Sequence, residues 1–310
     1  MIKTKALVLL NMGAARSKDE LKTFLLNMFN DENILSIKNT TLRSMLASFI
    51  VMLRHDKAWE NYEQIGGSSP LHKLTDEFIS ALQKELPQYF ITTAMRYTSQ
   101  FAQTAIAKIK EQNITDVTLL PLYPQYSTTT TKSSLDDFIS KANNEFDINI
   151  IEPFYKNTLY NQAIIDNIKN TCDDISNTNL IFSAHGLPQK VINKGDVYQE
   201  HIEQNVEILS TMLKEENINF SSISLAYQSK VGPMKWLEPS LDNALEEFKD
   251  KNILIYPISF IIDNSETVFE LDIEYREIAE HIGIKDYKVV KCLNDSPTFI
   301  KAVKELVLDI

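Results

Sequence analysis

The chain has 310 residues, a formal net charge of −11 at pH 7, 44% hydrophobic residues and 24% charged residues. This balance is typical of a soluble globular protein, and the length suits two compact lobes because domains usually span about 100 to 200 residues. The negative charge argues against nucleic acid as a partner, since neutralising phosphates needs a concentrated basic surface.

Short apolar runs alternate with amphipathic stretches along the whole chain. Near-continuous apolar strands separated by helices are typical of parallel sheets covered on both faces. The sequence therefore predicts an α/β fold with two doubly wound lobes, residues 1–155 and 156–310, with the site in a cleft between them and the last helix packed back on the first lobe. Strands are expected at residues 5–11, 89–95, 116–123, 147–153, 178–184, 222–228, 252–259 and 286–292. Helices are expected at residues 17–29, 71–86, 99–112, 161–172, 196–217 and 296–308.

Glycine and cysteine usage narrows the class of ligand. Only seven glycines occur, and none forms the GxGxxG or GxxxxGK[ST] loops that cradle a dinucleotide or a triphosphate. The two cysteines, Cys172 and Cys292, stand far apart with no CxxC pattern, which argues against a disulfide framework and a structural zinc site. We expect two buried thiols and a ligand that is not a nucleotide.

A histidine follows one predicted strand at the point where ligands bind in open α/β sheets, beyond the carboxyl ends of the strands. In "LIFSAHGLP", residues 180–188, the strand delivers His185, and Gly186 and Pro188 then force a turn. An imidazole at a strand tip is a candidate functional group. The other four histidines are expected on the solvated surface: His55, His72, His201 and His281.

Three carboxylates follow another predicted strand, at Glu266, Glu270 and Glu274. On a helix the spacing of four aligns them, and like charges so placed repel by about 0.2 to 0.5 kcal/mol per pair. Apolar residues flank the row, so we expect it to line a cleft wall, where carboxylates attract a divalent metal or relay protons. Asp263 or Ser265 is expected to cap this helix.

Two further segments have more than one interpretation. Residues 119–138 carry Tyr123, Tyr126 and a run of hydroxyls, which either line a pocket or form a loop and a helix cap. The helix expected after residue 40 contains unusually many apolar residues and ends in Arg54 and Lys57. Its apolar stripe suits core packing, or a wall for a flat hydrophobic ligand that bears carboxylates.

Several motifs together resemble the ferrochelatase family, and they cover nearly the whole chain in the order and spacing of that family. The resemblance implies two Rossmann-like, chelatase-type lobes with a porphyrin cleft between them. It implies a lyase that inserts Fe²⁺ into a porphyrin with release of two protons, in haem biosynthesis. The motifs are "ALVLLNMG", "IGGSSPL", "YPQYS", "FSAHGLP", "YQSKVGPMKWLEP", "ISFIIDNSETVFELDIEY" and "LNDSP".

The resemblance also assigns roles to individual residues. It implies that His185 and Glu266 are the catalytic pair, facing each other across the cleft. Glu270 and Glu274 would continue from Glu266 along a π-type helix, so that all four residues handle the metal or its protons. The implied porphyrin contacts are Met12, Arg54, Tyr62, Ser69 and Trp236.

The chain departs from the family pattern at Asn264, where many members have a histidine, so a second histidine's part in proton or metal transfer is in doubt. No [2Fe-2S] cluster is expected, because the chain ends at Ile310 with only two cysteines. Iron is expected as a substrate, with no permanently bound cofactor. Two alternatives remain: a non-catalytic porphyrin- or metal-binding protein, and a two-lobed metallohydrolase.

Location and substrate are the least defined features. The opening residues 1–13 lead directly into a strand without a secretory signal, which predicts a cytoplasmic protein. The longest apolar run, residues 45–53, is too short to span a bilayer, which takes about 20 residues. It would either contact a membrane surface peripherally or form the lip of the cleft. The sequence does not choose between protoporphyrin IX and coproporphyrin III.

Overall fold

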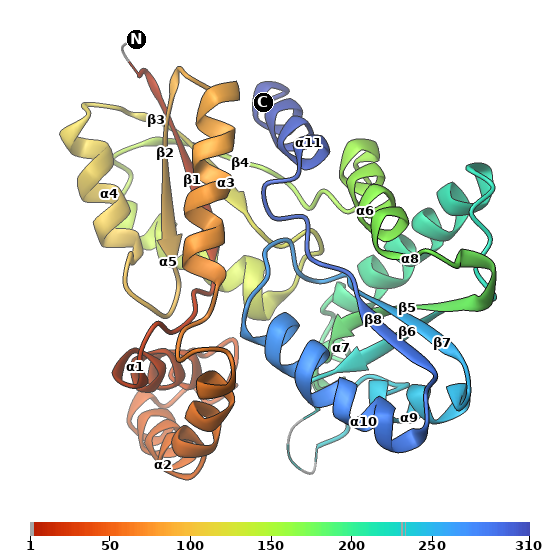
Figure 1. Ribbon diagram of the computed structural model, residues 1–310. Coiled ribbons are helices and arrows are strands. Elements are labelled where there is room, and N and C mark those ends of the chain that lie inside the picture. The colour runs from red at the N-terminus through yellow and green to blue at the C-terminus, as the bar shows by residue number, and fades with distance from the viewer. Residues whose placement is uncertain (1–2, 231, 233) are drawn as a thin grey trace. The chain divides into compact units, whose positions relative to one another are not determined.

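The chain folds into two compact units, each described here by itself. The computed structural model describes residues 3–230, 232 and 234–310 (Figure 1). Unit 1 comprises the chain up to Pro153 together with Val303–Ile310, and unit 2 comprises Phe154–Ala302. The boundary that the sequence predicts lies between residues 155 and 156. The final helix, α11 (Pro297–Leu308), contributes its second half to unit 1, where Lys304 pairs with Glu85 at 2.9 Å.

Each unit is built on one four-stranded sheet in which all strands are parallel, as the sequence predicts. The strand orders are β2-β1-β3-β4 in unit 1 and β6-β5-β7-β8 in unit 2, so the same topology occurs twice. The strands of unit 1 are β1 (Lys5–Asn11), β2 (Tyr89–Met95), β3 (Asp116–Pro121) and β4 (Asp147–Ile150). Those of unit 2 are β5 (Thr178–His185), β6 (Ser222–Gln228), β7 (Asn252–Pro257) and β8 (Asp286–Val289).

The third strand of each unit ends at a proline, two residues before the predicted end. Pro121 closes β3 and Pro257 closes β7. Proline has no N–H to continue a parallel ladder, so the chain leaves the sheet at these points. The segments that follow β3 and β7 are therefore not held in the sheet by strand pairing.

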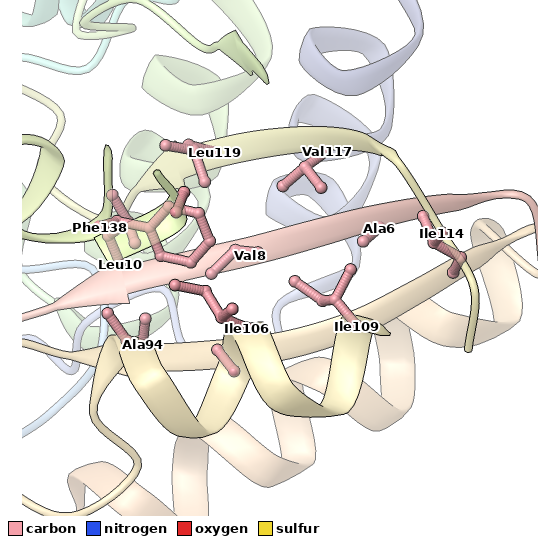
Figure 2. Close-up of a cluster of buried hydrophobic side chains, with 13 residues drawn as sticks. Ala6, Val8, Leu10, Ala94, Ile106, Ile109, Ile114, Val117, Leu119 and Phe138 are labelled. Atoms are coloured by element: carbon pink, nitrogen blue, oxygen red, sulfur yellow. The ribbon is translucent and has the colours of Figure 1, made fainter. Parts of the chain in front are cut away.

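Helices cover both sheets, and the core of unit 1 shows how. Val8 and Leu10 on β1 and Leu119 on β3 pack against Ile106 on α4 and Phe138 on α5 (Figure 2). The helices before α6 are α1 (Lys18–Phe29), α2 (Thr40–Gln64), α3 (Leu71–Glu85), α4 (Ala102–Glu111), η1 (Thr128–Lys132) and α5 (Ser133–Ala142). Those of unit 2 are α6 (Thr158–Thr171), η2 (Ile175–Asn177), α7 (Gln189–Ile192), α8 (Tyr198–Glu215), α9 (Leu241–Leu245), η3 (Glu246–Phe248), η4 (Glu266–Glu274) and α10 (Tyr275–Ile282).

A π-helix follows the third strand in both units, η1 after β3 and η4 after β7. Such segments are rare and gather at functional sites. The helix α2 runs on to Gln64 instead of ending near Arg54 and Lys57, because no glycine interrupts it before Gly66. Within the described residues, none of the helices combines the length and apolar character needed to cross a membrane.

Gly13 allows the chain to turn sharply after β1. Its φ is +86°, and a Cβ there would lie 2.2 Å from Thr98 Oγ1. Gly66 has nearly the same φ, +87°, but a Cβ there would have nothing within 4 Å. A comparison of alanine substitutions at Gly13 and Gly66 therefore separates the energetic cost of backbone strain from that of a steric clash.

We expect Gly66→Ala to lower the free energy of unfolding by about 1 to 2 kcal/mol, the penalty for a left-handed non-glycine residue. Gly13→Ala should lower it by about 1 to 3 kcal/mol more, because the methyl group overpacks against Thr98. Urea unfolding followed by circular dichroism measures both. Equal losses for the two variants would contradict the close packing of Gly13.

Candidate functional site

The site lies in unit 2 at the carboxyl ends of β5 and β7, which are neighbours in the sheet. The chain leaves β5 toward β6 on one side and leaves β7 toward β8 on the other. This is a topological switch point, where the diverging loops of an open α/β sheet leave a crevice that binds ligands. His185 is the last residue of β5, and Glu266 begins the π-helix η4 after β7.

The imidazole of His185 and the carboxylate of Glu266 face each other directly. Nδ1 of His185 lies 3.4 Å from Oε1 of Glu266, and the two side chains remain 33% and 40% exposed. Nδ1 is buried and has no hydrogen-bond partner among the described residues. The ring of Phe260 packs edge-on against the imidazole, with centroids 6.2 Å apart and planes at 85°. The pair therefore places a buried, unsatisfied nitrogen beside a carboxylate oxygen, while other atoms of both side chains remain exposed.

A network of polar side chains fixes the start of η4. The Asn264 side chain accepts a hydrogen bond from the Glu266 backbone N–H at 2.8 Å. Asp263 accepts hydrogen bonds from Thr267 Oγ1 at 3.0 Å, from the Cys292 backbone N–H at 3.1 Å and from Asn294 Nδ2 at 2.8 Å. These bonds hold the beginning of the π-helix against the segment after β8.

Ser265 occupies the N-cap position of this helix, as one of the two predictions has it, but its side chain makes no capping hydrogen bond. The other predicted cap, Asp263, bonds to the Thr267 hydroxyl and to residues after β8, and to no backbone N–H of η4. Asn264 performs the capping, because its short amide side chain reaches the N–H two residues ahead. The residue at which this chain departs from the family pattern therefore has a structural role here.

Glu270 is the second carboxylate of the site, and it is held by the end of β6. Ser229 Oγ donates to Glu270 Oε2 at 2.6 Å, and Gln228 Nε2 donates to the same oxygen at 3.1 Å. Gln228 is itself oriented by Ser183, whose Oγ donates to its Oε1 at 2.9 Å. This series of bonds links β5, β6 and η4. Glu274, one step further along the row, is exposed.

Desolvation by the surrounding protein controls the charges of the site. Burial raises the pKa of Glu266 from its ordinary 4.5 to about 7. Burial also raises the pKa of Glu270 to about 7, with the negative charge of Glu266 adding to the effect and the Ser229 hydrogen bond opposing it. For His185 burial lowers the pKa, while the Glu270 charge opposes that change. Near neutral pH the imidazole is therefore uncharged and the two carboxyls are partly protonated.

Trp236 lies at the turn that follows His185. It forms an isolated β-bridge with Pro188, and its Cε3 would lie 3.5 Å from a Cβ placed on Gly186. The same Cβ would lie 2.7 Å from the backbone oxygen of Gln228, so only glycine fits between the two strand ends. The structure therefore brings Trp236 beside Gly186, the residue that follows His185. Val231 and Pro233 of the same motif lie outside the described residues.

The other predicted porphyrin contacts belong to unit 1, and two of them, Tyr62 and Ser69, bond to the turn after β1. The hydroxyl of Tyr62 accepts a long hydrogen bond, 3.4 Å, from the Ala15 backbone N–H. The Ser69 backbone N–H donates to the Ala15 oxygen at 3.0 Å. Met12 lies three residues before Ala15, and Arg54 is exposed on α2 two turns before Tyr62. Tyr62 and Ser69 are themselves buried.

Sequence reasoning missed several residues of the site. Gln228 and Ser229 stand in a quoted motif, but only the fold brings residue 229 next to residue 270. The expectation for His72 was also wrong, since it is buried and its Nε2 lies 2.8 Å from the Ala14 oxygen. The two cysteines are free and buried, as predicted.

A duplicated four-stranded parallel fold with an imidazole and carboxylates at the switch point defines a chelatase-type protein. Among solved structures, SirB from Bacillus subtilis with Fe³⁺ is similar in fold, with a TM-score of 0.59, 11% sequence identity, and coverage of 99% of this chain and 95% of that one. The Ferrochelatase family model matches residues 4–309. This chain therefore belongs to the ferrochelatase family.

Relatives at higher identity agree with this assignment. A ferrochelatase of a Nitratiruptor species is 52% identical over 307 residues, covering 97% of this chain and 98% of the relative. A ferrochelatase of Sulfurimonas denitrificans is 46% identical over 311 residues, covering 98% of each chain. The similarity spans both units, so it includes the segments that carry His185 and the glutamate row.

The raised pKa of Glu270 predicts a pH-dependent gain in stability for Glu270→Gln. A carboxyl whose folded pKa lies above its unfolded value destabilises the fold progressively as the pH rises from about 4.5 to 7. The neutral amide should therefore raise the free energy of unfolding by about 1 kcal/mol at pH 8, after allowance for solvent at the open side, and by little at pH 4.5.

Urea unfolding at the two pH values measures this effect. Glu277→Gln, on the exposed face of α10, serves as the control for loss of a surface charge. A Glu270→Gln variant that is no more stable than wild type at pH 8 would rule out a desolvated carboxyl at this position.

Proposed function

We propose that this protein inserts ferrous iron into a porphyrin, as a lyase of the metal chelatase type in haem biosynthesis. The observation that carries the proposal is the unpartnered Nδ1 of His185, 3.4 Å from Glu266, with a second desolvated carboxyl at Glu270. Family membership over residues 4–309 supports the same reaction.

The His185 and Glu266 pair has a spacing that suits a transient metal ligand set. Two donor atoms that each bind one divalent ion at about 2.1 Å lie about 3.4 Å apart when the angle at the ion is near tetrahedral. A neutral imidazole keeps its lone pair for the metal, and a partly protonated Glu266 does not trap the cation. Among the described residues no group of three or more His, Cys, Asp or Glu side chains is placed to hold a metal ion. We therefore assign iron as a substrate that passes through.

The carboxyls account for the protons. Replacing two pyrrole N–H protons by Fe²⁺ requires acceptors, and a group with a pKa of about 7 both accepts and releases a proton near neutral pH. Glu266 and Glu270 supply two such groups, and the exposed Glu274 continues the row to solvent. We assign the row as the proton path and His185 with Glu266 as the catalytic pair.

For the porphyrin we propose five contact residues, each argued within its own unit. Trp236 beside Gly186 offers an aromatic surface in unit 2, and Arg54 offers an exposed guanidinium that suits a propionate. The remaining proposed contacts are Met12, Tyr62 and Ser69.

A Cys₄ iron–sulfur cluster takes four thiolates, so the two cysteines of this chain cannot supply one.

His185→Ala should lower the rate of iron insertion at least about 100-fold, because it removes the nitrogen that carries the proposal. Anaerobic initial rates with protoporphyrin IX and with coproporphyrin III measure the loss and also identify the substrate. His281→Ala, an exposed histidine on α10, serves as the control. Wild-type rates in His185→Ala would refute the assignment, and fewer than one haem per wild-type chain would indicate a binding protein.

We further propose that α2 contacts a membrane surface peripherally. Leu42, Met45, Phe49 and Met52 recur at helical spacing along one face, and each is more than half exposed. Lys57 on the same helix adds an exposed cation that anionic lipid attracts.

Replacing Phe49 and Met52 together by glutamate should reduce sedimentation of the protein with phosphatidylglycerol vesicles several-fold. Gln64→Glu, at the end of the same helix, adds charge outside the stripe and serves as the control. Unchanged vesicle binding together with a raised KM for porphyrin would instead assign the stripe to the lip of a porphyrin site.

A further inference from the structure

Two side-chain hydroxyls hold the backbone of His185. The His185 N–H donates to Ser259 Oγ at 2.8 Å, and the Tyr198 hydroxyl donates to the His185 carbonyl oxygen at 2.9 Å. Ser259 therefore holds the peptide group before the His185 Cα, and Tyr198 holds the peptide group after it.

The Ser259 bond forms where regular pairing of β5 with β7 ends. The last paired residues are Ser183 and Pro257, and the Ile258 N–H still donates to the Ser183 oxygen at 3.0 Å. Beyond this point β7 has no backbone group on the His185 N–H, and the Ser259 side chain takes that place. On its other edge His185 still pairs with Gln228 of β6. His185 is therefore held on both edges although the ladder on one side has ended.

We propose that Tyr198 and Ser259 are positioning residues that fix the direction of the His185 imidazole toward Glu266. Neither hydroxyl bonds to the imidazole, so both act through the peptide groups on either side of the His185 Cα. The proposal rests on the proposed function, since it assumes that the reaction uses the His185 nitrogen. Loss of either hydroxyl leaves one of these two peptide groups without its side-chain partner, so the direction of the side chain is less well fixed.

Single hydroxyl deletions test the proposal. Ser259→Ala and Tyr198→Phe should each lower kcat for iron insertion about 10-fold with KM for the porphyrin unchanged, because small displacements of a reacting group slow catalysis steeply. The double variant should fall further than either single variant, since each hydroxyl holds a different peptide group of His185. Ser259→Thr keeps the hydroxyl and should restore most of kcat.

The chain provides matched controls in the neighbouring strand. Tyr227 and Ser224 of β6 each carry a buried hydroxyl that has no hydrogen-bond partner among the described residues. Tyr227→Phe and Ser224→Ala remove the same atoms without breaking a bond, so both should keep the wild-type kcat. An equal fall in these controls, or wild-type kcat in both Ser259→Ala and Tyr198→Phe, would overturn the proposal.

A readout without substrate separates this proposal from the proposed function. In protein labelled with ¹⁵N-histidine, the two ring nitrogen signals of His185 should shift in Ser259→Ala and Tyr198→Phe and stay unchanged in Tyr227→Phe. If the wild type shows no iron insertion, the proposed function fails while these shifts still decide the positioning. Unshifted signals in both Ser259→Ala and Tyr198→Phe would overturn the positioning role whatever the wild-type activity.

Discussion

Desolvation of two carboxyls beside a neutral imidazole is the interaction on which the site depends. Three glutamates at spacing of four would repel one another if fully ionised. Burial raises the pKa of Glu266 and Glu270 to about 7, so near neutral pH the row carries only part of its charge. The same burial keeps His185 uncharged. A path for protons or a cation needs this partial protonation. A fully charged row would hold a metal ion, and a fully protonated row would accept no proton.

The fold produces this environment from the topology of one sheet. β5 and β7 are neighbours whose connections run in opposite directions, and Pro257 ends their pairing so that the following segment can turn back over the strand tips. Gly186 lets the chain pass within bonding distance of Gln228, which in turn contacts Glu270. Unit 1 repeats the strand order and the π-helix after its third strand, but serine and threonine stand there in place of the glutamates.

Much of this arrangement could be predicted from the sequence, and the limits have physical causes. All eight strands were predicted because fully buried parallel strands appear in a sequence as unbroken apolar runs. The ends of the strands depend on prolines and on strand pairing, which hydrophobic periodicity does not show. His185 and Glu266 were found from strand tips and from resemblance to the family. Ser229 was assigned no role, and Tyr198 and Ser259 were not recognised at all. Their partners lie 13 to 74 residues away, and only the closed sheet brings them together.

The most direct test is to titrate the carboxyl carbons of Glu266 and Glu270 by ¹³C NMR in the protein without metal or porphyrin. The signals are assigned from the corresponding Glu→Gln variants. The account predicts that both carboxyls titrate near pH 7, together with a His185 imidazole that stays neutral through that range. Titration of both carboxyls near 4.5 would contradict it, because the row would then be fully charged at neutral pH.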